Sequence, residues 1–152
     1  MEELIRRFNK AGVRYLLIGG QAVRLEGVPR FSMDWDFYIP PHDEKNTALI
    51  NSLMGKEADI PLEILGRKGE GFIQTYSTTW GIVQFHLGGP GIPPFAEAEA
   101  RAIMLKTETG LQVRAMCLDD LIRAKEAAGR PQDLTDAAYL REKKSVHKKP
   151  QR

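Results

Sequence analysis

The segment that most constrains this chain of 152 residues is FSMDWDFY (31–38), in which apolar and polar side chains alternate. Alternation is typical of a β-strand, because successive side chains of a strand point to opposite faces of its sheet. A strand over 30–39 would place Phe31, Met33, Trp35 and Phe37 on one face and Ser32, Asp34, Asp36 and Tyr38 on the other. Two carboxylates, those of Asp34 and Asp36, would then lie side by side. Because burying unpaired like charges is costly, the pair predicts a bound cation.

The chemistry of this pair suits a hard divalent metal. Mg²⁺ takes one or two protein carboxylates, and substrate phosphates complete its coordination shell. In two-metal sites the ions lie about 3.5–4 Å apart and stabilise the attacking and leaving oxygens together. We therefore expect Asp34 and Asp36 to hold Mg²⁺ or Mn²⁺. The alternative is a solvent-facing pair on an edge strand that binds nothing.

A glycine pair precedes the acidic strand. VRYLLIG (13–19) is an apolar run typical of a buried strand, and GQAVRLEG (20–27) is predicted to be a short helix that begins at Gly20. Gly19 and Gly20 therefore join a strand to a helix N-terminus, where bare backbone N–H groups suit phosphate. The alternative is an ordinary tight turn. Arg30 would either add a cation for a triphosphate or form an ion pair that holds the loop.

The rest of the pattern predicts an α/β (α+β) fold in which helices pack on a mixed sheet. Helices are expected at 2–11, 44–55 with Asp43 as N-cap, 96–102, 118–130 and 131–144. Paired strands are expected at 72–77 and 80–87, and a second hairpin over 103–117 turns at Thr109 and Gly110. A Gly- and Pro-rich loop spans 88–95. Gly129 and Pro131 punctuate the last two helices, which form a helical hairpin.

Composition predicts one domain over 1–144 and a basic, flexible tail over 145–152. The last twelve residues hold six Lys or Arg against one Glu, whereas the other 140 hold 16 basic against 19 acidic residues. Such a tail either binds nucleic acid or is a solvated terminus. A single cysteine, Cys117, excludes an internal disulfide, and no apolar run is long enough to span a membrane. We expect a cytoplasmic protein.

Two segments resemble a known family. GGQAVRLEGVPRFSMDWDFYI (19–39) resembles the signature of the polymerase-β-like nucleotidyltransferase superfamily, in which a glycine turn and helix precede a strand bearing D-x-D. The spacing of Arg30 in PRFSMDWD is similar to that in its small bacterial members, the antibiotic nucleotidyltransferases and the transferases of abortive-infection and toxin–antitoxin systems. LDDLIRAKEAAGRPQDLTDAAYL (118–140) resembles the ending common in the last group. The resemblance implies a nucleotidyltransferase fold with a C-terminal helical hairpin.

The resemblance also implies roles for individual residues. Gly19, Gly20 and Gln21 would cradle phosphate, and Asp34 and Asp36 would hold metal. Lys125 and Arg130 would line the nucleotide side, and the alternative for Lys125 is a solvated helix face. Asp133 and Asp136 belong to a segment that family members use mainly to pack the helical pair.

One position departs from the family pattern. The family supplies a third carboxylate from a later strand, and here Gln84 in GIVQFHL stands in its place. A glutamine carbonyl can bind Mg²⁺ weakly but cannot accept a proton from an attacking hydroxyl. His86 lies two residues on, on the same face by alternation, and is a candidate base or ligand; the alternative is a structural histidine. Glu63 and Glu70 are further candidates, with no pattern that favours either.

These observations predict a metal-dependent nucleotidyltransferase that moves a nucleoside monophosphate from an NTP to a hydroxyl. The acceptor is a small molecule, a protein or an RNA end. Because Gln84 replaces the third carboxylate, the alternative is a catalytically impaired nucleotide-binding module of the same fold. Such a module would act as a sensor or with a partner protein in a two-component, toxin–antitoxin-like system.

Overall fold

The computed structural model describes residues 1–62 and 73–148. Its helices are α1 (Glu2–Ala11), α2 (Gly19–Leu25), α3 (Glu44–Met54), the short 3₁₀ helix η1 (Gly55–Glu57), α4 (Phe95–Ala100), α5 (Leu118–Ala128) and α6 (Pro131–Lys148). Its strands are β1 (Leu16–Ile18), β2 (Asp34–Tyr38), β3 (Ile73–Thr78), β4 (Gly81–His86), β5 (Ile103–Lys106) and β6 (Gln112–Ala115). Within the described ranges, none of the helices has the length and apolar character needed to cross a bilayer.

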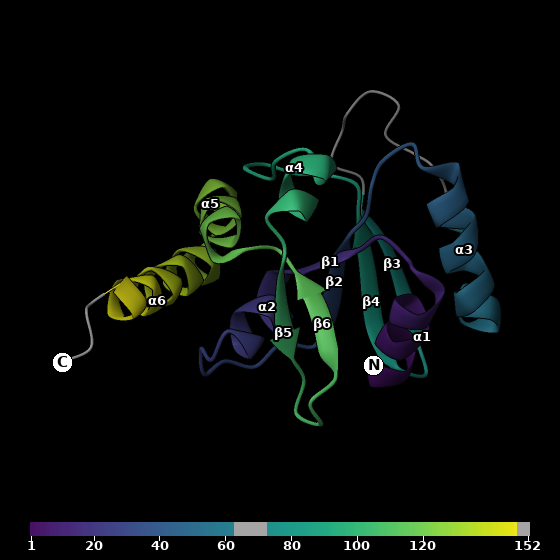
Figure 1. Ribbon diagram of the computed structural model, residues 1–152, viewed down its shortest axis with the longest axis horizontal. Helices are drawn as coiled ribbons and strands as arrows, with labels where there is room; N and C mark the ends of the chain where they lie inside the picture. Colours follow the sequence, from purple (N-terminus) through teal and green to yellow (C-terminus); the bar gives the residue numbers. More distant parts are fainter. Residues whose placement is uncertain (63–72, 149–152) are drawn as a thin grey trace.

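The described strands form one mixed sheet in the order β3-β4-β2-β1-β6-β5. β2 lies inside it, antiparallel to β1 and parallel to β4. Figure 1 shows α1 and α3 at one side of this sheet and the α5–α6 hairpin at the other. Because β2 has a partner on each side, its two aspartates lie on an interior strand and not on an edge.

An aromatic cluster holds α1 against one face of the sheet. The Phe8 ring of α1 lies 5.6 Å from that of Phe37 and 6.4 Å from that of Phe85, centroid to centroid. All three side chains are fully buried, and burial of each such side chain stabilises the fold by about 1.5–3 kcal/mol. Since Phe37 takes the core face of β2, Asp36 must face the opposite side.

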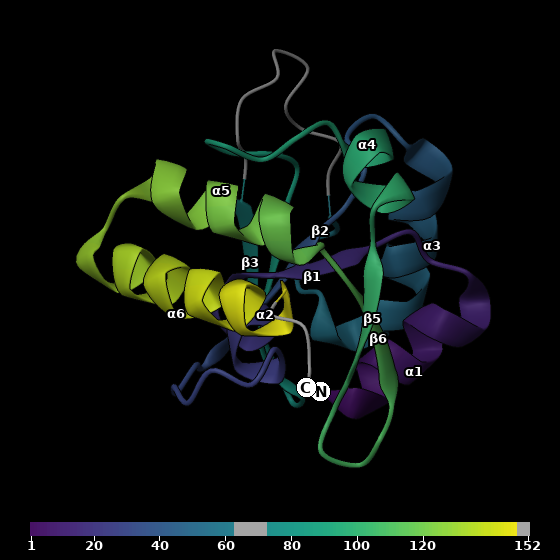
Figure 2. The same cartoon turned by 60° about the vertical axis from the view of Figure 1, so that its left-hand side comes forward.

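The C-terminal helices form the predicted hairpin, and Figure 2 shows them side by side in opposite directions. α5 ends at Gly129 in a left-handed conformation with φ 70°, and Pro131 opens α6. Leu121 and Leu140 bury their side chains in the core. The cap predicted for α3 is also present, because the Asp43 carboxylate accepts a hydrogen bond from the backbone N–H of Asn46.

Several boundaries differ from the sequence prediction, and the strand expected over 13–19 is limited to β1 (Leu16–Ile18). The strand expected over 30–39 is limited to β2, and Phe31 and Met33 are 80% and 65% exposed. β1 is only three residues long, and the pairing of β4 with β2 begins at Asp34. Residues 30–33 therefore pair with neither of these strands. α2 begins at Gly19 instead of Gly20. α6 continues to Lys148, so residues 145–148 of the predicted tail are helical.

Candidate functional site

The turn from β1 into α2 brings backbone unusually close to the acidic strand. Gly19 has φ 70°, and a Cβ at this position would lie 2.4 Å from Oδ2 of Asp36. A Cβ on Gly20 would lie 2.7 Å from Oγ of Ser32 and 3.0 Å from Nη1 of Arg30. Because of its positive φ and this contact, Gly19 must lack a side chain for the start of α2 to pack directly against Asp36, whereas a Cβ on Gly20 would require the Ser32 and Arg30 side chains to shift.

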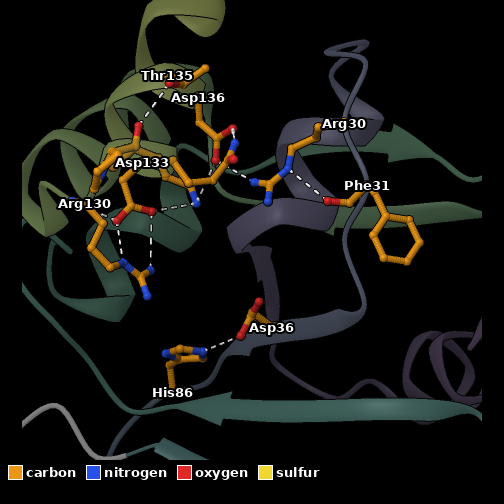
Figure 3. Close-up of polar contacts among 11 residues, drawn as sticks. Arg30, Phe31, Asp36, His86, Arg130, Asp133, Thr135 and Asp136 are labelled. Carbon is orange, nitrogen blue, oxygen red and sulfur yellow. Dashed lines mark hydrogen bonds and ion pairs between the residues drawn. The ribbon is translucent and has the colours of Figure 1, made fainter.

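Asp34 and Asp36 differ in their contacts although they share one face of β2. Oδ1 of Asp36 lies 2.8 Å from Nε2 of His86, and both side chains are largely buried (Figure 3). The partly exposed Asp34 side chain has no ion pair or hydrogen bond with any residue that the structure describes. No basic side chain of the described ranges therefore neutralises Asp34.

The strand register places Gln84 directly beside Asp36. Parallel pairing of β2 with β4 sets Asp36 opposite Gln84, and β3 sets Thr75 on the far side of Gln84. The Gln84 side-chain amide donates to Oγ1 of Thr75 over 3.3 Å. An uncharged amide thus stands beside Asp36 on the same face of the sheet, where the sequence resemblance led us to look for a third carboxylate.

Basic residues from the C-terminal hairpin face the acidic strand. The side chain of Lys125 on α5 is only 11% exposed, and its Nζ lies 3.3 Å from Oδ1 of Asp133. Lys125 is therefore not on a solvated helix face. Arg130 donates to Oδ2 of Asp133 over 2.7 Å, and this bond is the main reason that the Arg130 pKa is raised; Asp36 adds a smaller attraction. Burial alone would raise the pKa of Asp133, but bonds and charge from Arg130 and Lys125 outweigh it and hold that pKa below its usual value.

Arg30 forms an ion pair, which is one of its two predicted roles. Its Nη1 lies 2.5 Å from Oδ2 of the buried Asp136 on α6, and its Nε donates to the Phe31 carbonyl (Figure 3). Gln21 is also engaged. Its amide nitrogen donates to the Ser32 carbonyl over 2.8 Å, and its amide oxygen accepts from Arg24. The Gln21 side chain therefore supports the 30–33 segment in this structure.

A pocket of about 320 Å³ lies between the sheet and the helical hairpin. The side chains that line it include Ile18, Gly19 and His86 from the sheet side and Lys125, Arg130 and Asp133 from the hairpin. The loop that follows β4 closes a third side. A Cβ on Gly91 of this loop would lie 2.5 Å from that of Ala127, so the loop packs tightly against α5.

A buried tyrosine holds the far end of the same loop. The Tyr38 hydroxyl donates to the Pro93 carbonyl over 2.8 Å, and burial raises the pKa of Tyr38 to about 12, so the hydroxyl keeps its proton at neutral pH. Sequence reasoning missed this loop and the α5 residues Ala124 and Ala128 as pocket walls. The one available signal was the pair of small residues four apart, which share a helix face.

The structure thus brings Gly19, His86, Lys125 and Arg130 to one pocket, with Asp36 against Gly19 and His86. Within residues 1–62 and 73–148, no three His, Cys, Asp or Glu side chains group closely enough to hold a metal ion by themselves. Glu63 and Glu70, named above as further candidates, lie outside the described residues.

No protein-family model matches this chain, and no curated protein matches it. Solved structures do match. One is the solution structure of the antibiotic-resistance factor ANT(2'')-Ia, an antibiotic nucleotidyltransferase, with a TM-score of 0.55 and 13% sequence identity. The match covers 95% of this chain and 85% of that chain. The chain has a nucleotidyltransferase-like fold. At this identity the likeness concerns the fold alone.

Proposed function

We propose that this protein is a metal-dependent nucleotidyltransferase that transfers a nucleoside monophosphate from an NTP to a hydroxyl. The observation that carries the proposal is the placement of Asp36, which shares a face of β2 with Asp34, against Gly19 and His86 of a pocket that also holds Lys125 and Arg130. Within a nucleotidyltransferase-like fold, this arrangement offers acidic groups for a metal and positive charge for phosphates.

The residues on the acidic strand fit a divalent cation. Asp34 has no counter-ion in the described ranges, and Asp36 has one oxygen against Gly19 and the other on His86. Two carboxylates suffice for Mg²⁺ or Mn²⁺ when phosphate oxygens supply further ligands. Asp34 and Asp36 would hold the metal, and Gln84 would offer at most a weak carbonyl ligand. Bound there, the metal would supply Lewis-acid stabilisation of the triphosphate.

The other residues bind and orient the nucleotide. Gly19 lines the pocket at the turn from β1 into α2, and Lys125 and Arg130 provide positive charge for phosphates from the hairpin wall. Their charges are shared with Asp133 and Asp136, and Arg30 is the further cation in this cluster. A volume of about 320 Å³ is at the lower end of that of small-molecule pockets.

His86 is the group best placed to receive the proton of the acceptor hydroxyl. It lines the pocket and its Nε2 contacts Asp36. With Nε2 protonated and donating to Asp36, Nδ1 carries the lone pair needed by a general base. Asp36 would then set the orientation of the imidazole ring. Small-molecule, protein and RNA hydroxyls are all acceptors of the required chemistry.

The proposal is tested with purified protein, Mg²⁺ and NTPs labelled on the α-phosphate. We expect label on an added acceptor or on the protein itself, and we expect Asp34→Asn to abolish it. Glu44→Gln is the matched control, because it removes one acidic charge from an exposed position on α3. An Asp34→Asn variant that transfers label as well as the wild type would contradict the mechanism.

A second candidate function rests on Gln84. Because an amide stands beside Asp36 instead of a carboxylate, the protein would bind Mg–NTP and turn it over poorly or not at all. It would then act as a nucleotide sensor or with a partner protein. Calorimetric binding of a Mg–NTP without any transfer of label supports this candidate, and absence of binding to every NTP eliminates both functions.

A further inference from the structure

A carboxylate in α6 is surrounded by donors from three segments. Asp136 is 1% exposed. Its Oδ2 lies 2.5 Å from Nη1 of Arg30 and 3.1 Å from Nζ of Lys125, and its Oδ1 accepts from the Gln132 amide over 2.9 Å. Asp136 itself does not line the pocket. It therefore acts on the site only through the residues that it holds.

The two cations held by Asp136 come from different parts of the fold. Arg30 belongs to the segment that enters β2 four residues before Asp34, and its Nη1 lies 3.0 Å from where a Gly20 Cβ would be. Lys125 belongs to the α5 wall. One buried carboxylate thus connects the segment that carries the acidic strand and the glycine turn to the helix that carries the pocket cation.

We propose that Asp136 is a positioning residue of the nucleotide site, which fixes the α5–α6 hairpin and the acidic strand at the separation that a metal-bound triphosphate requires. The proposal rests on the function proposed above. It opposes a simpler idea, in which Arg30 and Lys125 are phosphate ligands that Asp136 merely neutralises. The two ideas predict opposite effects of removing the Asp136 charge.

The chain offers a matched control at the other end of α6. Lys143 lies 3.4 Å from Oε2 of the buried Glu26, directly after α2. This link also ties α6 to the residues between α2 and β2, but neither Lys143 nor Glu26 lines the pocket between sheet and hairpin. Lys143→Gln therefore also weakens the docking of α6 on the residues before β2, but it leaves the contacts of Arg30 and Lys125 unchanged.

The test is calorimetry with the magnesium complexes of the imido analogues of ATP and GTP. We expect Asp136→Asn to raise the Kd of the analogue that binds by about 10- to 100-fold, the usual effect of losing a supporting group behind a ligand. Lys143→Gln should change it by less than about twofold. Unchanged or tighter binding by Asp136→Asn overturns the proposal, because the added net positive charge would then have outweighed any loss of geometry.

A second variant, Arg30→Lys, tests the same proposal if Asp136→Asn does not fold. Arg30→Lys retains the positive charge but loses the planar fork that Arg30 presents to Asp136. A positioning role predicts at least a tenfold rise in Kd, whereas a purely electrostatic role predicts little change, which would overturn the proposal.

A third readout separates this proposal from the proposed function. In ¹⁵N-labelled protein without nucleotide, the Nη1 hydrogens of Arg30, which lie against Oδ2 of Asp136, should exchange with solvent at least about tenfold faster in Asp136→Asn than in the wild type or Lys143→Gln. Unchanged exchange shows that Asp136 does not hold Arg30 and overturns the positioning role. If instead the exchange responds as expected but the wild type binds neither analogue, the function proposed above fails while Asp136 still holds Arg30.

Discussion

Two pairs of aspartates in this molecule have opposite environments. The strand pair, Asp34 and Asp36, forms no ion pair with arginine or lysine in the described ranges, and its one side-chain hydrogen bond there is between Asp36 and His86. The helix pair, Asp133 and Asp136, is almost fully buried and contacts Arg30, Lys125 and Arg130. Both pairs lie on the same side of the sheet, with the pocket between the sheet and the hairpin.

The difference indicates what each pair does. A buried carboxylate needs hydrogen bonds and opposite charge, and the helix pair receives both from within the chain. Within the part of the chain that the structure describes, the strand pair receives only the His86 imidazole and a weaker attraction from Arg130, both at Asp36, so solvent or a cation from outside is left to relieve the charge on Asp34. The helix pair thus stabilises the docking of the hairpin, and the strand pair is the one that we propose as the metal site.

The largest expected effect comes from adding a third acid to the strand pair. If the protein is the impaired module, Gln84→Asp places the missing carboxylate beside Asp36, and we expect the rate of label transfer to rise by about 10²–10⁴-fold, the range spanned by a general base. Gln112→Asp adds the same charge at an exposed position on β6 and should leave transfer unchanged. If Gln84→Asp still binds Mg–NTP but transfers no faster, the missing carboxylate is not what limits turnover.

The close approach of Gly19 to Asp36 is tested by comparing Gly19→Ala with the same substitution at Gly12. Gly19→Ala combines an unfavourable φ with a Cβ 2.4 Å from Oδ2 of Asp36, and we expect it to lower the free energy of unfolding by about 2–4 kcal/mol. Gly12→Ala has a similar φ of 76° and no atom within 4 Å, so it should cost only about 1–2 kcal/mol. Urea denaturation measures both, and equal losses would show that Asp36 does not need the space.

The contrast between the pairs also predicts that the same Asp→Asn change lowers stability in one pair and not in the other. Asp133→Asn removes the charge that Lys125 and Arg130 pair with, so unfolding should become easier by about 1–3 kcal/mol. Asp34→Asn should change the free energy of unfolding by less than about 0.5 kcal/mol, since no such bond is lost. A large loss in Asp34→Asn, measured by urea denaturation, would reveal a structural role for the strand pair.

The smallest effect is a dependence on acid pH. The pKa of Asp133 is lower in the folded protein than its ordinary value of 3.8. Its ionised form therefore stabilises the fold above that value, and the contribution is lost as the pH falls through the folded pKa. The difference in unfolding free energy between wild type and Asp133→Asn should shrink from pH 6 to pH 3. A constant difference would contradict the lowered pKa.

Much of the fold could be predicted because its signals are local. Asp43 as a cap, the turn at Gly129 and Pro131, and the alternation in Asp34–Tyr38 each depend on a few neighbouring residues. The strand prediction extended too far, to Phe31, because alternation does not reveal whether a neighbouring strand is present to supply hydrogen bonds.

The candidate site was predictable only in part. The acidic strand and the glycine turn are contiguous in sequence, so their proximity followed from local pattern. The Arg30–Asp136 pair joins residues 106 positions apart, and nothing in either segment identifies the other as its partner. Likewise, the wall formed by the loop at Gly91 depends on contact with Ala127, which only the packed structure reveals.

The most direct test of the central claim is a crystal structure of the protein soaked with Mn²⁺ and a non-hydrolysable NTP analogue. The account predicts an anomalous Mn²⁺ peak bridging the Asp34 and Asp36 carboxylates, with the triphosphate directed toward Gly19 and Lys125. Nucleotide bound elsewhere, or a strand pair that holds no metal while the analogue occupies the pocket, would contradict it.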